Sequence, residues 1–78
     1  MTTTQHLNHL CVATGVPWEF VDGDPEVFGG KWQLMPANPA DEDDFWFWHL
    51  THAPQWFNSR QAAAESLLRS WAAWQQRN

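Results

Sequence analysis

Four histidines and one cysteine are the residues whose types and spacing could hold a metal ion. The histidines form two His-x-x-His pairs, His6/His9 and His49/His52, and Cys11 follows the first pair closely. Four imidazoles, or three imidazoles and a thiolate, would satisfy the tetrahedral coordination of zinc. The spacing suits one face of a helix for the first pair, but turns the second pair to opposite sides of a strand. We therefore interpret the histidines as separate surface or capping residues and expect no cofactor, with a zinc site as the alternative.

The residues that could support catalysis lack the neighbours that catalysis requires. Cys11 occupies an apolar position of a predicted helix, which is typical of a buried and unreactive thiol. Gly29 and Gly30 are not followed by the Lys-Ser/Thr pair and the helix of a phosphate-binding loop. The acidic run at 41–44 has no interleaved apolar residues of the kind that tune catalytic carboxyl groups. We predict that the protein is not an enzyme.

The composition indicates a short chain with an aromatic core. The 78 residues include seven Trp and five Phe, and we predict a single domain over 1–78. A domain of this size buries only about 60 % of its unfolded-chain surface. Each Trp or Phe hides roughly 150–250 Å², so these residues are an efficient way to build a small core. The same aromatic residues could also form a binding surface.

Cysteine usage and the apolar runs bear on the compartment. A single cysteine excludes an intramolecular disulfide, which favours a reducing cytoplasm. Residues 1–6 lack the basic and apolar regions of a signal peptide. The longest aromatic-apolar run, 45–48, is far shorter than the ~20 residues that span a bilayer. We predict a cytoplasmic protein that makes no membrane contact.

The charge balance bears on the choice of partner. The net charge is −5, and three of the four basic residues lie at or beyond Arg60. Sequence-tolerant binding of nucleic acid needs a basic groove that neutralises phosphates. We therefore expect no direct binding of nucleic acid, and instead a protein partner with a basic surface. A homodimer is compatible with the same composition.

Periodicity and turn residues predict an α+β fold with a helix near each end. A short helix is expected at 4–14, with Thr3 or Thr4 as its N-cap and Gly15 as its stop signal. A long amphipathic helix is expected at 59–76, packed on the sheet and capped by Asn58 or Ser59. Its apolar side carries Ala63, Ala64, Leu67, Leu68, Trp71 and Trp74.

Three segments rich in aromatic and β-branched residues predict two to three strands of one antiparallel sheet, at about 18–21, 31–35 and 45–51. Residues 26–28 are interpreted as a further extended segment. The second strand should turn Trp32 and Leu34 inward, and Lys31 and Gln33 outward. The third is apolar on both faces, so we expect the first helix to cover its second face, with an exposed aromatic patch as the alternative.

The run Asp41-Glu42-Asp43-Asp44 follows two prolines and predicts a loop. Four carboxylates next to an aromatic segment could imitate phosphates, steer a basic partner and anchor the contact. The candidate partner-binding residues are therefore Asp41, Glu42, Asp43, Asp44, Phe45 and Phe47. The alternative is a solvated loop with no partner.

Three features of the chain can be compared with known classes of small protein. They are the Met1-Thr2-Thr3-Thr4 start, the acidic run at 41–44 and the Trp-rich composition. The chain resembles small phage-encoded inhibitors of the anti-CRISPR type. This resemblance implies a protein that binds a host nucleic-acid-handling complex and blocks its nucleic-acid or partner site, in the cytosol of the host.

Three other functions remain open at this point. An immunity or antitoxin protein could use the same acidity to neutralise a basic toxin. A binder of small ligands or single-stranded nucleic acid could use stacked tryptophans. A zinc protein could use the histidines.

Overall fold

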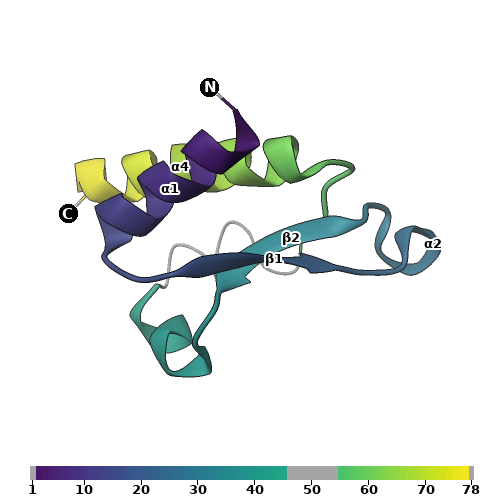
Figure 1. Cartoon of the computed structure of the whole chain (residues 1–78), viewed down its shortest axis with the longest axis horizontal. Coiled ribbons are helices and arrows are strands. Elements are labelled where there is room, and N and C mark those ends of the chain that lie inside the picture. Colours follow the sequence, from purple (N-terminus) through teal and green to yellow (C-terminus); the bar gives the residue numbers. More distant parts are fainter. Residues whose placement is uncertain (1, 46–54, 78) are drawn as a thin grey trace.

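The structure, a computed structural model, describes residues 2–45 and 55–77 and places two helices on one face of a β-hairpin (Figure 1). The elements in chain order are α1 (Thr3–Thr14), β1 (Trp18–Asp22), α2 (Pro25–Phe28), β2 (Trp32–Pro36), the 3-10 helix η1 (Pro39–Asp44) and α4 (Arg60–Arg77). This arrangement confirms the predicted α+β class, with a short first helix, an antiparallel sheet and a long second helix packed on it.

Helix α1 begins one residue earlier than predicted. Thr2, rather than Thr3 or Thr4, is the N-cap, and it forms a capping box with Gln5. The Thr2 hydroxyl accepts from the Gln5 amide at 3.2 Å, and the Gln5 side chain accepts from the Thr2 amide at 2.8 Å. At the other end Gly15 adopts φ 78°, which confirms the predicted left-handed stop.

Strands β1 and β2 pair antiparallel, with Phe20 opposite Leu34 and Trp18 opposite Pro36. Leu34 faces the helices and is fully buried, as predicted. Gln33 points to the opposite face, but its predicted exposure is wrong, because only 7 % of the residue is accessible. Its Nε2 donates to the carbonyl oxygen of Gln55 at 3.3 Å. The second face of the hairpin is therefore covered at this position.

The extended segment predicted at 26–28 is wrong, because these residues belong to helix α2. The Asp24 carboxylate accepts from the Glu26 amide at 2.9 Å, and Pro25 occupies the first helical position. Gly29, with φ 76°, ends the helix after a single turn. Capping chemistry at both ends thus overrides the β-propensity of the apolar residues in between.

The loop predicted over 36–44 is wrong for most of its length, because Pro36 ends β2 and Pro39–Asp44 form the 3-10 helix η1. The Asn38 side chain accepts from the Ala40 amide at 3.1 Å, and Pro39 opens the 3-10 helix η1. The predicted strand 45–51 lies outside the described residues except for Phe45, which directly follows η1.

Helix α4 starts at Arg60, where the Ser59 hydroxyl accepts from the Ala62 amide at 3.1 Å. Its buried side consists of Ala63, Ala64 and Leu67, which form one core with Leu10 of α1 and Leu34 of β2. The predicted apolar side of this helix is confirmed. Leu68, Trp71 and Trp74 pack against the same core while remaining partly accessible.

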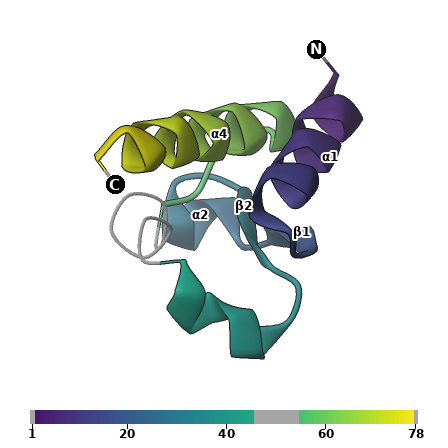
Figure 2. The ribbon, with the colours of Figure 1, turned by 90° about the vertical axis from the view of Figure 1, so that its left-hand side faces the viewer.

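Helix α1 lies beside α4 on the same face of the hairpin, and η1 lies on the other side (Figure 2). The two helices run in the same direction, and the Thr3 hydroxyl donates to Gln61 Oε1 at 2.7 Å near their first turns. The prediction that the first helix covers the second face of the 45–51 strand concerns residues that, apart from Phe45, lie outside the described part of the chain. Helix α1 itself joins the layer of the long helix.

Candidate protein interface

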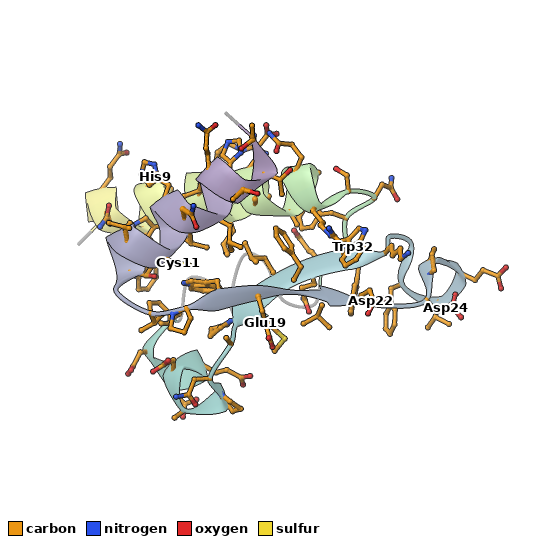
Figure 3. All side chains as sticks on the ribbon, viewed as in Figure 1. His9, Cys11, Glu19, Asp22, Asp24 and Trp32 are labelled. Carbon is orange, nitrogen blue, oxygen red and sulfur yellow. The ribbon has the colours of Figure 1, made fainter. Side chains whose placement is uncertain are left out.

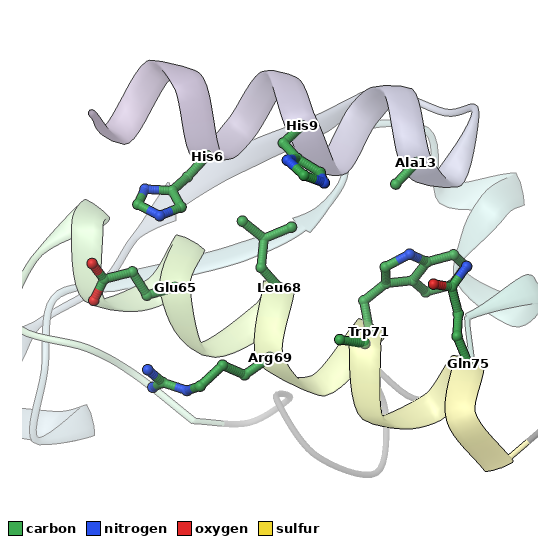
Figure 4. Close-up of a pocket in the computed structure, with 9 residues that line it drawn as sticks. His6, His9, Ala13, Glu65, Leu68, Arg69, Trp71 and Gln75 are labelled. Carbon is green, nitrogen blue, oxygen red and sulfur yellow. The ribbon is translucent and has the colours of Figure 1, made fainter. Parts of the chain in front are cut away.

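The histidines of the first pair line an open groove of about 540 Å³ between α1 and α4 (Figure 4). His6 points toward the α4 turn that carries Glu65, and His9 lies over Leu68. The Nδ1 atom of His6 is buried without a hydrogen-bond partner in the described part of the chain. Within residues 2–45 and 55–77, no three His, Cys, Asp or Glu residues come together to hold a metal ion. The second pair, His49 and His52, lies outside the described residues.

This groove mixes opposite charges. Glu65 and Arg69 both line it, and the Glu65 carboxylate accepts from Gln61 Nε2 at 2.9 Å. The remaining lining includes Trp71 and Gln75 but no serine or cysteine. Cys11 is a free, half-buried thiol packed against the core, so it is less enclosed than expected. Among the described residues, the lining of the groove therefore pairs one carboxylate, Glu65, with one guanidinium, Arg69.

The described tryptophans are occupied in packing. Trp18 is buried, and its indole Nε1 donates to the Thr14 hydroxyl at 2.8 Å. The Arg60 guanidinium lies 4.2 Å from the ring centroid of Trp32, over its face. The other described tryptophans, Trp56, Trp71 and Trp74, are half-buried. The Trp18 indole is thus enclosed in the core, and one face of the Trp32 indole is occupied by Arg60.

Phe45, predicted as a partner contact, lies in the core. It is only 7 % exposed, with its ring centroid 5.2 Å from that of Trp18 and 6.4 Å from that of Trp71. These tilted and edge-on contacts tie the end of η1 to β1 and α4. Phe47, the other predicted aromatic contact, lies outside the described residues.

The four predicted acidic contact residues lie together on η1. Asp43 and Asp44 are exposed, whereas Asp41 and Glu42 are half-buried. Backbone hydrogen bonds hold the segment, from the Asp41 amide to the Asn38 carbonyl at 2.9 Å and from the Phe45 amide to the Glu42 carbonyl at 3.3 Å. These adjacent carboxylates thus lie on one short, hydrogen-bonded helix on the side of the hairpin away from α1 and α4.

Charge is segregated between the two halves of the molecule. All acidic residues except Glu65 lie between residues 19 and 44, whereas α1 has no Asp, Glu, Lys or Arg. Figure 3 shows Glu19 on the η1 side of the hairpin, and Asp22 and Asp24 toward its α2 end. Electrostatic steering acts through such a one-sided distribution. The sequence already shows that the acidic residues are concentrated between residues 19 and 44. Only the fold shows that this stretch forms the hairpin and η1, apart from the two long helices.

Sequence reasoning missed a second surface, at the α2 end of the hairpin. Val27 is 71 % exposed and Phe28 is 47 % exposed. The Phe28 ring stacks on the indole of Trp56, with centroids 4.5 Å apart and an interplanar angle of 23°. We call Val27, Phe28 and Trp56 the α2 tip.

No helix within the described ranges is both long enough and apolar enough to cross a bilayer. Comparison with known protein families, with curated proteins and with solved structures finds no match for this chain.

Proposed function

We propose that this protein is a non-enzymatic inhibitor of a nucleic-acid-handling complex, of the anti-CRISPR kind that its composition resembles. It binds a basic surface of that complex and blocks access of the nucleic acid or of a partner subunit. The segregation of its carboxylates to the sheet and η1 side supports this proposal. A surface that binds nucleic acid must be basic, and a one-sided acidic protein is complementary to it.

Helix η1 supplies the carboxylates best placed to imitate a phosphate backbone. Asp43 and Asp44 are adjacent and exposed, and the helix fixes their backbone before any partner arrives. Charges held in position lose less conformational freedom on binding than charges on a loose chain. Long-range attraction between such a surface and a basic groove raises the rate of encounter.

We expect removal of these two charges to slow association with the target. In an η1 variant, Asp43→Asn with Asp44→Asn, the association rate should fall roughly three- to tenfold at low salt, because steering is weakened. The measurement is the association rate with a panel of RNA-guided effector complexes, together with inhibition of their DNA binding. The difference should shrink as salt rises, since the Debye length falls from about 10 Å at 0.1 M to about 3 Å at 1 M.

A matched control variant distinguishes the effect of where the charges lie from the effect of the protein's net charge. An α4 variant, Ala73→Lys with Gln76→Lys, changes the net charge by the same two units at exposed positions of the helical layer. It should associate at nearly the wild-type rate. Equal slowing in both variants would show that η1 has no special place in the contact. Failure of the wild-type protein to inhibit any complex in the panel would contradict the inhibitor proposal itself.

Direct binding of DNA or RNA should be undetectable at micromolar concentrations and physiological salt. Few counterions can be released, because the chain has only four basic side chains and Arg60 is engaged over the Trp32 ring. The measurement is a fluorescence-anisotropy titration with single-stranded DNA, single-stranded RNA and duplex DNA. Micromolar binding to any of them would favour the stacking alternative.

A further inference from the structure

We propose that the α2 tip is the hydrophobic anchor of the inhibitory interface. Val27 and Phe28, supported by Trp56, enter an apolar pocket on the target protein whose rim carries arginine or lysine side chains. This inference rests on the proposed function and adds the surface that supplies most of the contact energy. The acidic η1 side then determines mainly the association rate, and the α2 tip determines mainly the dissociation rate of the complex.

Exposure singles out the α2 tip among the described surfaces. The exposed large apolar side chains of the described residues are Val12, Val27 and Phe28. Single exposed apolar residues are common on protein surfaces and carry no meaning alone. Val27 and Phe28 are adjacent, however, and stand on a one-turn helix at the far end of the hairpin (Figure 1). Clustered aromatic and aliphatic side chains of this kind are typical of interface hot spots.

The α2 tip is held in its binding geometry before contact. The Phe28 ring rests on Trp56 with centroids 4.5 Å apart. A Cβ atom at Gly23 would come within 2.8 Å of the Trp56 ring and 2.9 Å of the Phe28 ring, so a glycine lets both rings pack over the backbone. An aromatic anchor that is already ordered loses little side-chain entropy on binding.

Charge complementarity defines the kind of pocket that the tip fits. Three exposed carboxylates, Asp22, Asp24 and Glu26 of α2, lie around the tip with one exposed cation, Lys31, whose carbonyl accepts from the Gly23 amide at 2.8 Å, so the rim is acidic on balance. An apolar patch with an acidic rim matches an apolar pocket with a basic rim and is repelled by an acidic one. Proteins that hold nucleic acid offer such pockets where base-stacking side chains lie between phosphate-binding residues.

Two equivalent substitutions test the α2 tip. Val27→Arg places a cation at the tip, and Val12→Arg makes the same change on α1, where the valine is 83 % exposed. Binding to an effector complex that the wild-type protein inhibits should weaken about 30-fold for Val27→Arg. It should change less than about twofold for Val12→Arg, in keeping with a near-neutral surface position. Both side chains are exposed, so both variants should keep the wild-type melting temperature.

A third variant separates lost apolar contact from added charge. Val27→Ser removes apolar surface without introducing a cation, and its affinity should fall about tenfold. This loss should persist at 1 M salt, whereas the loss caused by the η1 variant should vanish, because salt screens charge and does not weaken apolar burial.

The outcomes distinguish this inference from the proposed function. If Val27→Arg and Val27→Ser both bound with wild-type affinity and still inhibited, the proposal that the α2 tip is the anchor would be wrong. The inhibitor proposal would still stand. Equal weakening by Val12→Arg and Val27→Arg would also overturn it, because the effect would then not belong to the tip. If the wild-type protein bound no complex in the panel, both proposals would fall together.

Discussion

Replacing Leu67 with alanine is expected to lower the free energy of unfolding by about 2–5 kcal/mol, as cavity-forming substitutions in protein cores do. Leu67 is fully buried, and it belongs to the cluster that joins α4 to Leu10 of α1 and Leu34 of β2. All three elements therefore lose contacts when its side chain is shortened. A loss of about 3 kcal/mol would lower the melting temperature of a domain this small by roughly 12–24 °C. Thermal and urea denaturation followed by circular dichroism measure the change.

The neighbouring Leu68 provides the matched control for this substitution. Leu68 lines the open groove between the helices and is only half-buried. Leu68→Ala should therefore cost less than half as much, since less apolar surface returns to water on truncation. If both variants unfolded at the same temperature, the assignment of Leu67 to the centre of the core would be wrong.

A single methyl group at position 30 is expected to be almost as damaging. A Cβ at Gly30 would lie 2.7 Å from the carbonyl carbon and oxygen of Trp56, and 2.9 Å from the carbonyl carbon of Phe57. These are backbone atoms, and the Phe57 carbonyl accepts from the amides of Lys31 at 2.9 Å and Trp32 at 2.8 Å. Gly30→Ala must push the two segments apart, which should cost about 3 kcal/mol, the upper end for overpacked sites.

Gly15→Ala is the comparison for this second prediction. Gly15 has open space around its Cβ position but a φ of 78°, so alanine there costs backbone strain of about 1–2 kcal/mol. Hydrogen exchange should show faster exchange of the Trp32 amide in Gly30→Ala alone. Equal stability of the two alanine variants would mean that residues 56 and 57 do not pack against Gly30 as described.

Most of the fold could be predicted because its two main helices and its hairpin follow simple patterns. The 3.6-residue spacing of Ala63, Ala64 and Leu67 and the stop signal at Gly15 define helices without reference to the rest of the chain. The α2 helix could not be predicted in the same way. Its Val27 and Phe28 favour a strand, and the competing signal is a cap at Asp24 with proline after it.

The candidate site was predictable only in part. Adjacency in the sequence identified the four acidic residues, and a short helix indeed keeps them together. For Phe45, its position next to the acidic residues led to the prediction of a partner contact, whereas the ring lies in the core. A run that is aromatic on both faces does not indicate which rings are buried. The α2 tip depends on contact between Phe28 and Trp56, which are far apart in sequence. No local pattern encodes such a contact.

The pairing of α1 with α4 also determines when the chain can fold. The hydrogen bond from Thr3 to Gln61 joins residues 58 positions apart. At about 5–20 residues per second, a ribosome needs roughly 3–12 s to add that intervening stretch. During this interval α1 is an isolated helix of 12 residues, too short to be stable in water, and Leu10 has no α4 to cover it. We therefore expect the complete core, in which Ala63, Ala64 and Leu67 of α4 meet Leu10, to form only after α4 has been made.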